Sequence, residues 1–304
     1  MTQLLHVDLA GSADTYCRAL EDGAILFLAQ TPLAWGAGDR DALLACDTLP
    51  LTHKNISYRR DDDRLAGTGG RRDSLRLLMR SYVDQMTALL AHLLAPYAHC
   101  WRVETSSYRP QEEAVRALSW KTRNDLLHVD AFPSRPTNGD RILRVFTNLH
   151  PTRARCWITT ETFDALVGRL LARGAVPALA PPRGSSLWHS VRRRLVPYAP
   201  AALAPLARRS PYDAFMLRLH DHLKADAQFQ ASAPKQRWEF PPGSSWILFT
   251  DFVPHAALSG QFALEQTYIV PRAALLQPEK APVNILERLV GVPLTDRPVA
   301  SSPP

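Results

Sequence analysis

The chain has 304 residues, 46% of them hydrophobic and 21% charged, which is ordinary for a soluble globular protein whose core needs no disulfide or metal staples. Four widely spaced cysteines without a CxxC pair, no run of about eighteen apolar residues and no signal-peptide pattern argue against a disulfide scaffold, a membrane-spanning helix and a secretory leader. The net charge of +7 fits nucleic acid, an anionic membrane surface or a phosphorylated substrate.

The first hundred residues predict one strand, one loop and one long helix. Residues 24–29 (AILFLA) form the strand, and residues 59–72, which are polar and contain glycine, form the loop. Apolar residues then recur at helical spacing between positions 75 and 94. Asp73 or Ser74 caps this helix and Pro96 ends it.

Short strands dominate after Trp101. Strands are predicted at 142–149, 245–250 and 263–270, and helices at 160–172, which ends before Gly174, and at 211–224, which Ser210 caps. Residues 176–211 contain many prolines, alanines and arginines and are read as an insertion, and the Pro-rich tail from 276 is expected to lie on the surface.

Helices come first and short strands follow, with long connecting segments between them. This order favours a mainly β fold with flanking helices, a sandwich or cupin-like jelly roll, over a doubly wound sheet. We expect a single domain over 1–304, with a helical and mixed part at 1–100, a jelly-roll core at about 101–275 and a tail at 276–304.

A histidine and an aspartate two residues apart, in LLHVD at 126–130, suggest a metal site. Because side chains of a strand alternate between its faces, His128 and Asp130 point the same way. His255 lies between two predicted strands, from which a sandwich brings it beside this pair. Two imidazoles and one carboxylate on one side of a metal leave the other positions open, as in non-haem Fe(II) oxygenases. Alone, the His-x-Asp motif also fits an ordinary histidine near an aspartate.

A 2-oxoglutarate cosubstrate needs a cation for its distal carboxylate, ideally a guanidinium. Many oxygenases of this kind place it after the distal histidine, but the corresponding residue here is the neutral Gln266. Arg144 is our first candidate, because a guanidinium on so apolar a strand is costly to bury without an anion; a salt bridge at the rim is the simpler alternative. Arg109 is the second candidate, and Asn148 and Gln266 are candidates for additional hydrogen bonds.

Three runs extend the motif: LLHVDAFPSRPTNGDRILRVFTNLHP, SPYDAFMLRLHDHLK and PPGSSWILFTDFVPHAALSGQFALEQTYIVP. They resemble the Kdo 3-hydroxylases of Gram-negative bacteria, most densely over 101–275. The resemblance implies a double-stranded β-helix, with His128, Asp130 and His255 as ligands of Fe(II), and 2-oxoglutarate and O₂ as cosubstrates. It implies hydroxylation of Kdo at its 3-position, in Kdo-lipid A, to give Ko. The arginine missing after His255 departs from the wider superfamily and leaves the cosubstrate clamp open.

Such a substrate implies a cytoplasmic protein that is peripheral on the inner leaflet of the inner membrane. Within the insertion, Trp188 and neighbouring apolar residues lie beside Arg192, Arg193 and Arg194, a composition typical of an interfacial element. A helix docked on the sandwich with a solvated arginine edge is the simpler interpretation. We expect neither a nucleic-acid partner nor an obligate protein partner.

Two alternatives remain open. A dioxygenase of the same fold could act on another anionic metabolite or lipid, although a small substrate would not require the basic insertion. A non-catalytic jelly roll could bind an anionic glycolipid, although a binding module gains nothing from an open iron site.

Overall fold

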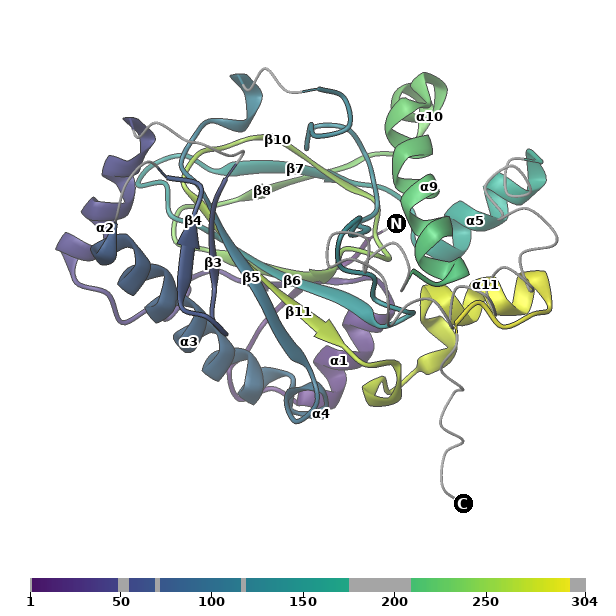
Figure 1. The fold of residues 1–304 in the computed structure, drawn as a ribbon, viewed down its shortest axis with the longest axis horizontal. Coiled ribbons are helices and arrows are strands. Elements are labelled where there is room, and N and C mark those ends of the chain that lie inside the picture. Colours follow the sequence, from purple (N-terminus) through teal and green to yellow (C-terminus); the bar gives the residue numbers. More distant parts are fainter. Residues whose placement is uncertain (1, 49–54, 69–71, 116–118, 175–208, 296–304) are drawn as a thin grey trace, which may run out of the picture.

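The computed structural model describes residues 2–48, 55–68, 72–115, 119–174 and 209–295, and two β-sheets that face each other form its centre (Figure 1). The large sheet has the order β1-β2-β9-β6-β11-β5-β3-β4, and the small sheet the order β10-β7-β8. All pairings are antiparallel except that of β1 with β2. The strands of the large sheet are β1 Leu4–His6, β2 Ile25–Leu28, β3 Ile56–Arg59, β4 Arg64–Ala66, β5 Arg102–Arg109, β6 Arg141–Asn148, β9 Ser245–Phe249 and β11 Ala263–Val270, and those of the small sheet are β7 Arg155–Thr159, β8 Gln236–Phe240 and β10 His255–Ser259.

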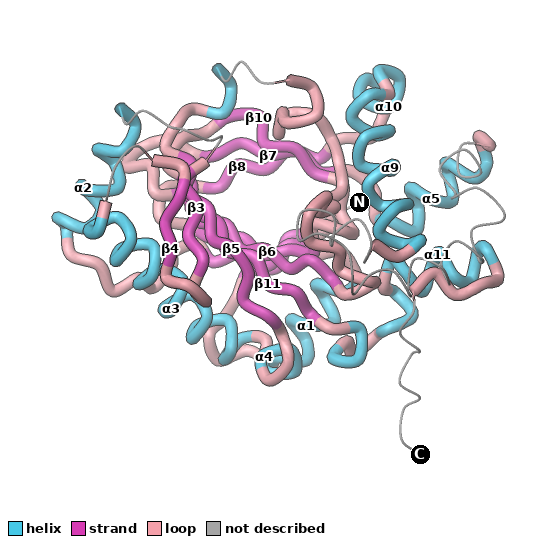
Figure 2. The backbone as a smooth tube through the Cα atoms, in the orientation of Figure 1, coloured by secondary structure: helices cyan, strands magenta, loops and turns pink. Residues whose placement is uncertain are grey.

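Helices flank the sheets in two groups (Figures 1 and 2). One group lies along the outer side of the large sheet and comprises α1 Ala13–Glu21, α2 Ala37–Leu44, α3 Asp73–Leu93 and α4 Ala95–Ala98. The other lies at one end of the sheets and comprises α5 Phe163–Ala172, α9 Pro211–Ala225, α10 Ala227–Ser232 and α11 Pro282–Val290. Short 3₁₀ turns occur at Ala45–Thr48, Glu113–Val115, Arg272–Ala274 and Pro278–Lys280. Among these described helices, none is both long enough and apolar enough to cross a bilayer.

Aromatic side chains from both sheets fill the space between them. Phe240 of β8 stacks on Trp246 of β9 with ring centroids 4.0 Å apart, and Trp157 of β7 packs against Phe146 of β6 at 4.6 Å. Inner faces that interdigitate in this way give a sheet-on-sheet core. The predicted mainly β architecture with flanking helices, a double-stranded β-helix, is confirmed.

The long amphipathic helix is also confirmed, because α3 buries its apolar residues against the outer face of the large sheet. Tyr82 of α3 hydrogen-bonds Thr147 of β6 at 3.1 Å, which fixes the helix on that face. Neither Asp73 nor Ser74 caps it, since the N-cap is Arg72 and makes no side-chain hydrogen bond. The helix does end before Pro96, which lies in the first turn of α4.

The loop predicted at 59–72 is partly wrong. Its first half forms the β3–β4 hairpin, whose turn contains Asp63 with a φ of 48°. Asp63 accepts a hydrogen bond from the Tyr58 hydroxyl at 2.8 Å and pairs with Arg76 of α3. The hairpin forms the edge of the large sheet, where a strand can carry charged, solvated residues. A charged sequence was therefore compatible with a strand.

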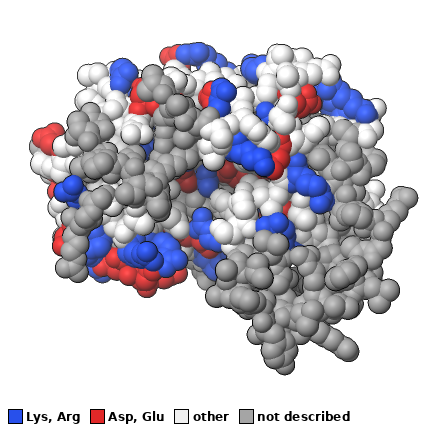
Figure 3. All heavy atoms as spheres, turned by 45° about the horizontal axis from the view of Figure 1, so that its top comes forward, with Lys and Arg blue, Asp and Glu red and all other residues white. Residues whose placement is uncertain are grey.

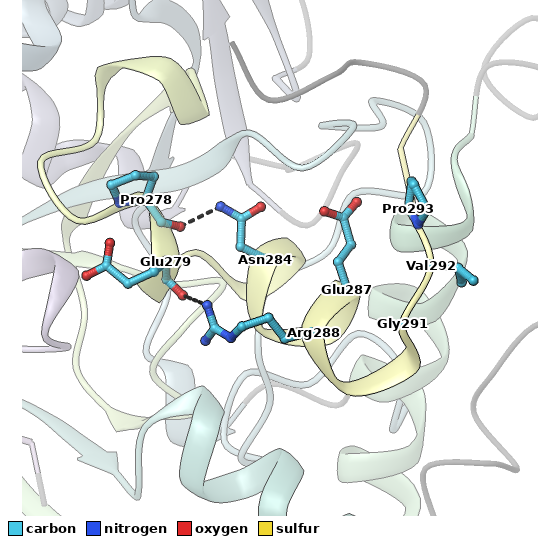
Figure 4. A pocket seen from close by; sticks show the side chains of 8 residues that line it. All are labelled: Pro278, Glu279, Asn284, Glu287, Arg288, Gly291, Val292 and Pro293. Carbon is cyan, nitrogen blue, oxygen red and sulfur yellow. Dashed lines mark hydrogen bonds between the residues drawn. The ribbon is translucent and has the colours of Figure 1, made fainter. Parts of the chain in front are cut away.

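The Pro-rich tail, which was expected to lie on the surface, contains a partly buried helix. Pro282 opens α11, and its Val283, Ile285 and Leu286 are buried. Figure 4 shows the surface pocket beside this helix, where Asn284 donates to the Pro278 carbonyl at 2.6 Å. This pocket contains none of the predicted metal ligands. The insertion predicted at 176–211 lies outside the described residues except for 209–211.

Candidate active site

The His-x-Asp segment is extended, but it belongs to neither sheet. His128 forms a single antiparallel bridge with His255: the His128 N–H donates to the His255 carbonyl at 3.1 Å, and the His255 N–H donates back at 2.9 Å. The Asp130 N–H donates to the Thr250 carbonyl at 2.8 Å. The prediction of a strand here is therefore wrong, yet the extended backbone still puts alternate side chains on opposite sides. His128 and Asp130 face inward together.

Three side chains converge at this point. One ligand atom from each of His128, Asp130 and His255 lies within 4.8 Å of the others, and all three residues are buried. Nε2 of His128 lies 3.7 Å from Oδ1 of Asp130. Within the described part of the chain, this is the one group of three or more His, Cys, Asp or Glu residues that could hold a metal ion.

Backbone carbonyls fix the orientation of both imidazoles. Nδ1 of His128 lies 2.7 Å from the Leu126 carbonyl, and Nδ1 of His255 lies 2.9 Å from the Val253 carbonyl. A carbonyl oxygen only accepts, so each Nδ1 carries the proton and each Nε2 keeps a free lone pair for a metal. The donor set therefore fits a cation.

Burial and neighbouring charges hold the three groups in the protonation states that a metal requires. Burial lowers the pKa of both His128 and His255, so the rings are neutral. Burial alone would raise the pKa of Asp130, but the positive charge of Arg144 and a hydrogen bond with Thr250 oppose it and the pKa is lowered. The site thus presents two neutral imidazoles and a carboxylate, as metal binding needs.

Both predicted arginines line the cavity beside these ligands, together with Asn124, Phe146, Trp157 and Ala257. Nη1 of Arg144 lies 3.1 Å from Oδ2 of Asp130 and 3.3 Å from Oε1 of Glu265. Arg109 pairs with Oε2 of Glu265. The cavity therefore combines metal ligands with two guanidiniums, and Arg144 contacts a ligand directly.

The structure does not bring Asn148 and Gln266 to this cavity. The Asn148 amide donates to the carbonyls of Arg153 and Phe240, which ties the end of β6 to β8. The Gln266 amide donates to the Glu104 carbonyl at 2.8 Å. Gln266 lies on the face of β11 opposite to Glu265, because strand neighbours alternate. Trp188, Arg192, Arg193 and Arg194 lie outside the described residues.

Three residues near the metal ligands were not predicted from the sequence. Trp157 stacks on the His255 ring with centroids 5.2 Å apart at 11°, and the His220 ring meets His128 edge-on at 5.0 Å. Glu265 is the third. The sequence around Glu265 could have indicated its role, because Glu265 is an acidic residue in an apolar strand, as Arg144 is a basic residue in one. Nothing in the sequence placed Trp157 or His220 beside the metal ligands.

A double-stranded β-helix with two histidines and one aspartate converging between its sheets defines the class of Fe(II)/2-oxoglutarate-dependent dioxygenases. The family model described as 3-deoxy-D-manno-oct-2-ulosonic acid (Kdo) hydroxylase matches residues 6–293. The chain belongs to the Kdo hydroxylase family.

Solved structures agree with this assignment. The Kdo hydroxylase KdoO, a non-haem Fe(II) α-ketoglutarate-dependent dioxygenase in complex with α-ketoglutarate and Fe(III), is 34% identical, with a TM-score of 0.82 over 99% of this chain and 100% of that one. The cobalt(II) complex of KdoO is 34% identical, with a TM-score of 0.83 over 98% of this chain and 99% of that one. No match was found among the curated proteins.

Proposed function

We propose that this protein hydroxylates the 3-position of Kdo in Kdo-lipid A to give Ko, with Fe(II) held by His128, Asp130 and His255 and with 2-oxoglutarate and O₂ as cosubstrates. The observation that carries the proposal is the convergence of the three ligands beside two guanidiniums in one cavity. Membership of the Kdo hydroxylase family supports the sugar acid as substrate. Arg144 is proposed to bind the distal carboxylate of 2-oxoglutarate, with Arg109 as the alternative or second donor.

When bound, iron with 2-oxoglutarate and O₂ supplies the oxidation that inserts one oxygen atom into a C–H bond and yields succinate and CO₂. The chain itself positions the metal and the cosubstrate and shields the reacting atoms from water. His128, Asp130 and His255 would hold the metal with three ligands, which would leave positions on the metal for the cosubstrate. Phe146 and Trp157 form apolar walls of the cavity and keep water from the reacting atoms. Arg144, next to Asp130, is placed to orient a dicarboxylate on the metal.

Mass spectrometry of the lipopolysaccharide inner core tests the reaction. Cells that express the protein should carry Kdo with one additional oxygen, and cells that lack it should not. Cells that express the His255→Ala variant serve as the control and should resemble cells without the protein. An unchanged core, with 2-oxoglutarate turnover stimulated by another anionic metabolite or lipid, would establish the alternative substrate. Absence of any turnover would favour a glycolipid-binding role.

We also propose that the protein acts at the inner leaflet of the inner membrane, through Trp188, Arg192, Arg193 and Arg194. The support is the basic and apolar composition of this segment together with the lipid nature of the proposed substrate. On the face drawn in Figure 3, the described Lys and Arg side chains form several separate groups, often beside acidic ones, and no single basic patch. On this face, the described residues therefore offer no concentrated basic patch that would compete with the charges of the insertion.

Replacing Arg192, Arg193 and Arg194 by serine should weaken binding to anionic vesicles by about two orders of magnitude, because each basic residue contributes about 1 kcal/mol near such a surface. Wild-type binding should also fall as salt rises. Vesicle co-sedimentation measures both effects. The matched control replaces the exposed Arg59, Arg60 and Arg64 of the β3–β4 hairpin by serine and should bind as wild type does. Equal binding of both triple variants would exclude the insertion as the docking element.

A further inference from the structure

Charges of alternating sign form a row that leads from β5 to the metal ligands. Arg109 of β5 pairs with one oxygen of Glu265 on β11, the other oxygen lies 3.3 Å from Arg144 of β6, and Arg144 reaches Asp130 at 3.1 Å. The sheet register explains the row. Arg109 lies opposite Ala263 and Arg144 opposite Thr267, so Glu265 is diagonal to both, on the same face.

Glu265 is the group that makes two arginines tolerable in this cavity. Its side chain is 3% exposed, and those of Arg109 and Arg144 are 10% and 14% exposed. A guanidinium this enclosed is costly without a carboxylate. Burial alone would raise the pKa of Glu265, but Arg144 and Arg109 outweigh it, so the pKa is lowered and the side chain is a carboxylate.

The two guanidiniums are not saturated by these contacts. Nε of Arg109 and Nε of Arg144 are buried and have no hydrogen-bond partner among the described residues. Both side chains line the cavity that contains the metal ligands. Because Glu265 takes one guanidinium on each oxygen, it holds the two apart and leaves part of each free for a further anion.

We propose that Glu265 is the positioning residue of the cosubstrate pocket, because it fixes the two guanidiniums at the spacing that receives the distal carboxylate of 2-oxoglutarate. This inference rests on the proposed function of Arg109 and Arg144. Glu265 itself contacts neither the metal ligands nor, in this role, the cosubstrate. Without its charge, Asp130 is the one anionic partner that Arg144 keeps among the described residues, and Arg144 is drawn toward this metal ligand.

Glu265→Gln is the direct test. The amide keeps the shape but offers one acceptor oxygen, and its NH₂ group faces the other guanidinium donor to donor. Titration of the Co(II)-loaded protein with 2-oxoglutarate should give a dissociation constant about tenfold or more above wild type, the loss expected for a charge-assisted hydrogen bond. Co(II) is titrated first, so that any loss of metal affinity through Arg144 and Asp130 is measured apart from the loss of 2-oxoglutarate affinity. In turnover with Fe(II), KM for 2-oxoglutarate should rise more than kcat falls.

Glu21→Gln is the matched control, because Glu21 is also a fully buried glutamate but binds Tyr97 and the backbone of Leu276 and Gln277. It should leave 2-oxoglutarate affinity unchanged. If Glu265→Gln does not fold, Glu265→Asp decides the question. The shorter carboxylate keeps the charge but cannot span both arginines, so we expect a smaller loss of affinity.

Wild-type affinity in the folded Glu265→Gln or Glu265→Asp variant would overturn the proposal. Tighter binding in Glu265→Gln would also overturn it, because Glu265 would then be a competitor for the arginines. Arg109→Ala and Arg144→Ala in the same titration separate this result from failure of the proposed function. If both retain wild-type affinity, the arginine assignment is wrong; if either weakens binding and Glu265→Gln does not, only the positioning role fails.

Discussion

Asp130→Ala, His128→Ala and His255→Ala should each abolish hydroxylation and lower metal affinity by more than about 100-fold, since even outer partners of metal ligands cost 10–100-fold when lost. Each substitution removes one of the three ligand atoms that lie within 4.8 Å of one another. Two ligands cannot hold iron in the open arrangement that the reaction needs. Hydroxylation assays and Co(II) titration measure the two effects, and circular dichroism verifies the fold.

His222→Ala is the control for these variants. His222 lies on α9 two residues after His220, but its Nε2 lies 3.9 Å from Oδ2 of Asp226 and it contributes no ligand. Its replacement should leave metal affinity and turnover unchanged. Full activity in any one of the three ligand variants would remove that residue from the proposed metal centre.

Arg144→Ala should raise KM for 2-oxoglutarate at least tenfold. A charge-assisted hydrogen bond contributes about 1.5–3 kcal/mol, and this guanidinium is enclosed, so water replaces it poorly. Arg144→Lys keeps the charge but loses the planar fork, and should give an intermediate KM. Steady-state kinetics with varied 2-oxoglutarate measure the effect.

Arg109→Ala tests the alternative arginine in the same assay, and Arg102→Ala is the control. Arg102 lies on β5, as Arg109 does, but its side chain is more than half exposed and far along the strand from the cavity. If Arg109→Ala raises KM and Arg144→Ala does not, the distal carboxylate belongs to Arg109. Comparison of metal affinity in Arg144→Ala with wild type shows how far its contact with Asp130 supports the ligand.

The sequence predicted the elements whose pattern is strong and local. The strand at 263–270 coincides with β11, and the helix at 211–224 with α9, whose cap Ser210 accepts from the Asp213 N–H. The small sheet was missed because its strands lack a continuous apolar run: β7 and β10 begin with a buried polar side chain, Arg155 and His255, and β8 contains two charged residues. Strands without such a run are recognised only once their partners are known.

The sequence predicted the metal ligands of the site but not all of the residues around them. That His128 and Asp130 share a face follows from the alternation of side chains along one segment. Whether Gln266 faces the cavity depends instead on how β11 is aligned with β6. In the structure Glu265 lies opposite Phe146, which puts Glu265 and not Gln266 on the inner face. A shift of one residue exchanges the two faces of a strand. The assignment therefore depends on the pairing between strands, which the sequence of one strand does not reveal.

The bridge between His128 and His255 has a consequence for how the protein acquires its metal. The two histidines hydrogen-bond each other through their backbones, and the carbonyls of Leu126 and Val253 fix their rings. In zinc fingers the unfolded chain becomes ordered only when it captures the ion, so binding energy is consumed by folding. Here the ligand geometry is built by the scaffold in advance. We therefore expect the free energy of metal capture to go into affinity, and the chain to stay folded when iron is removed.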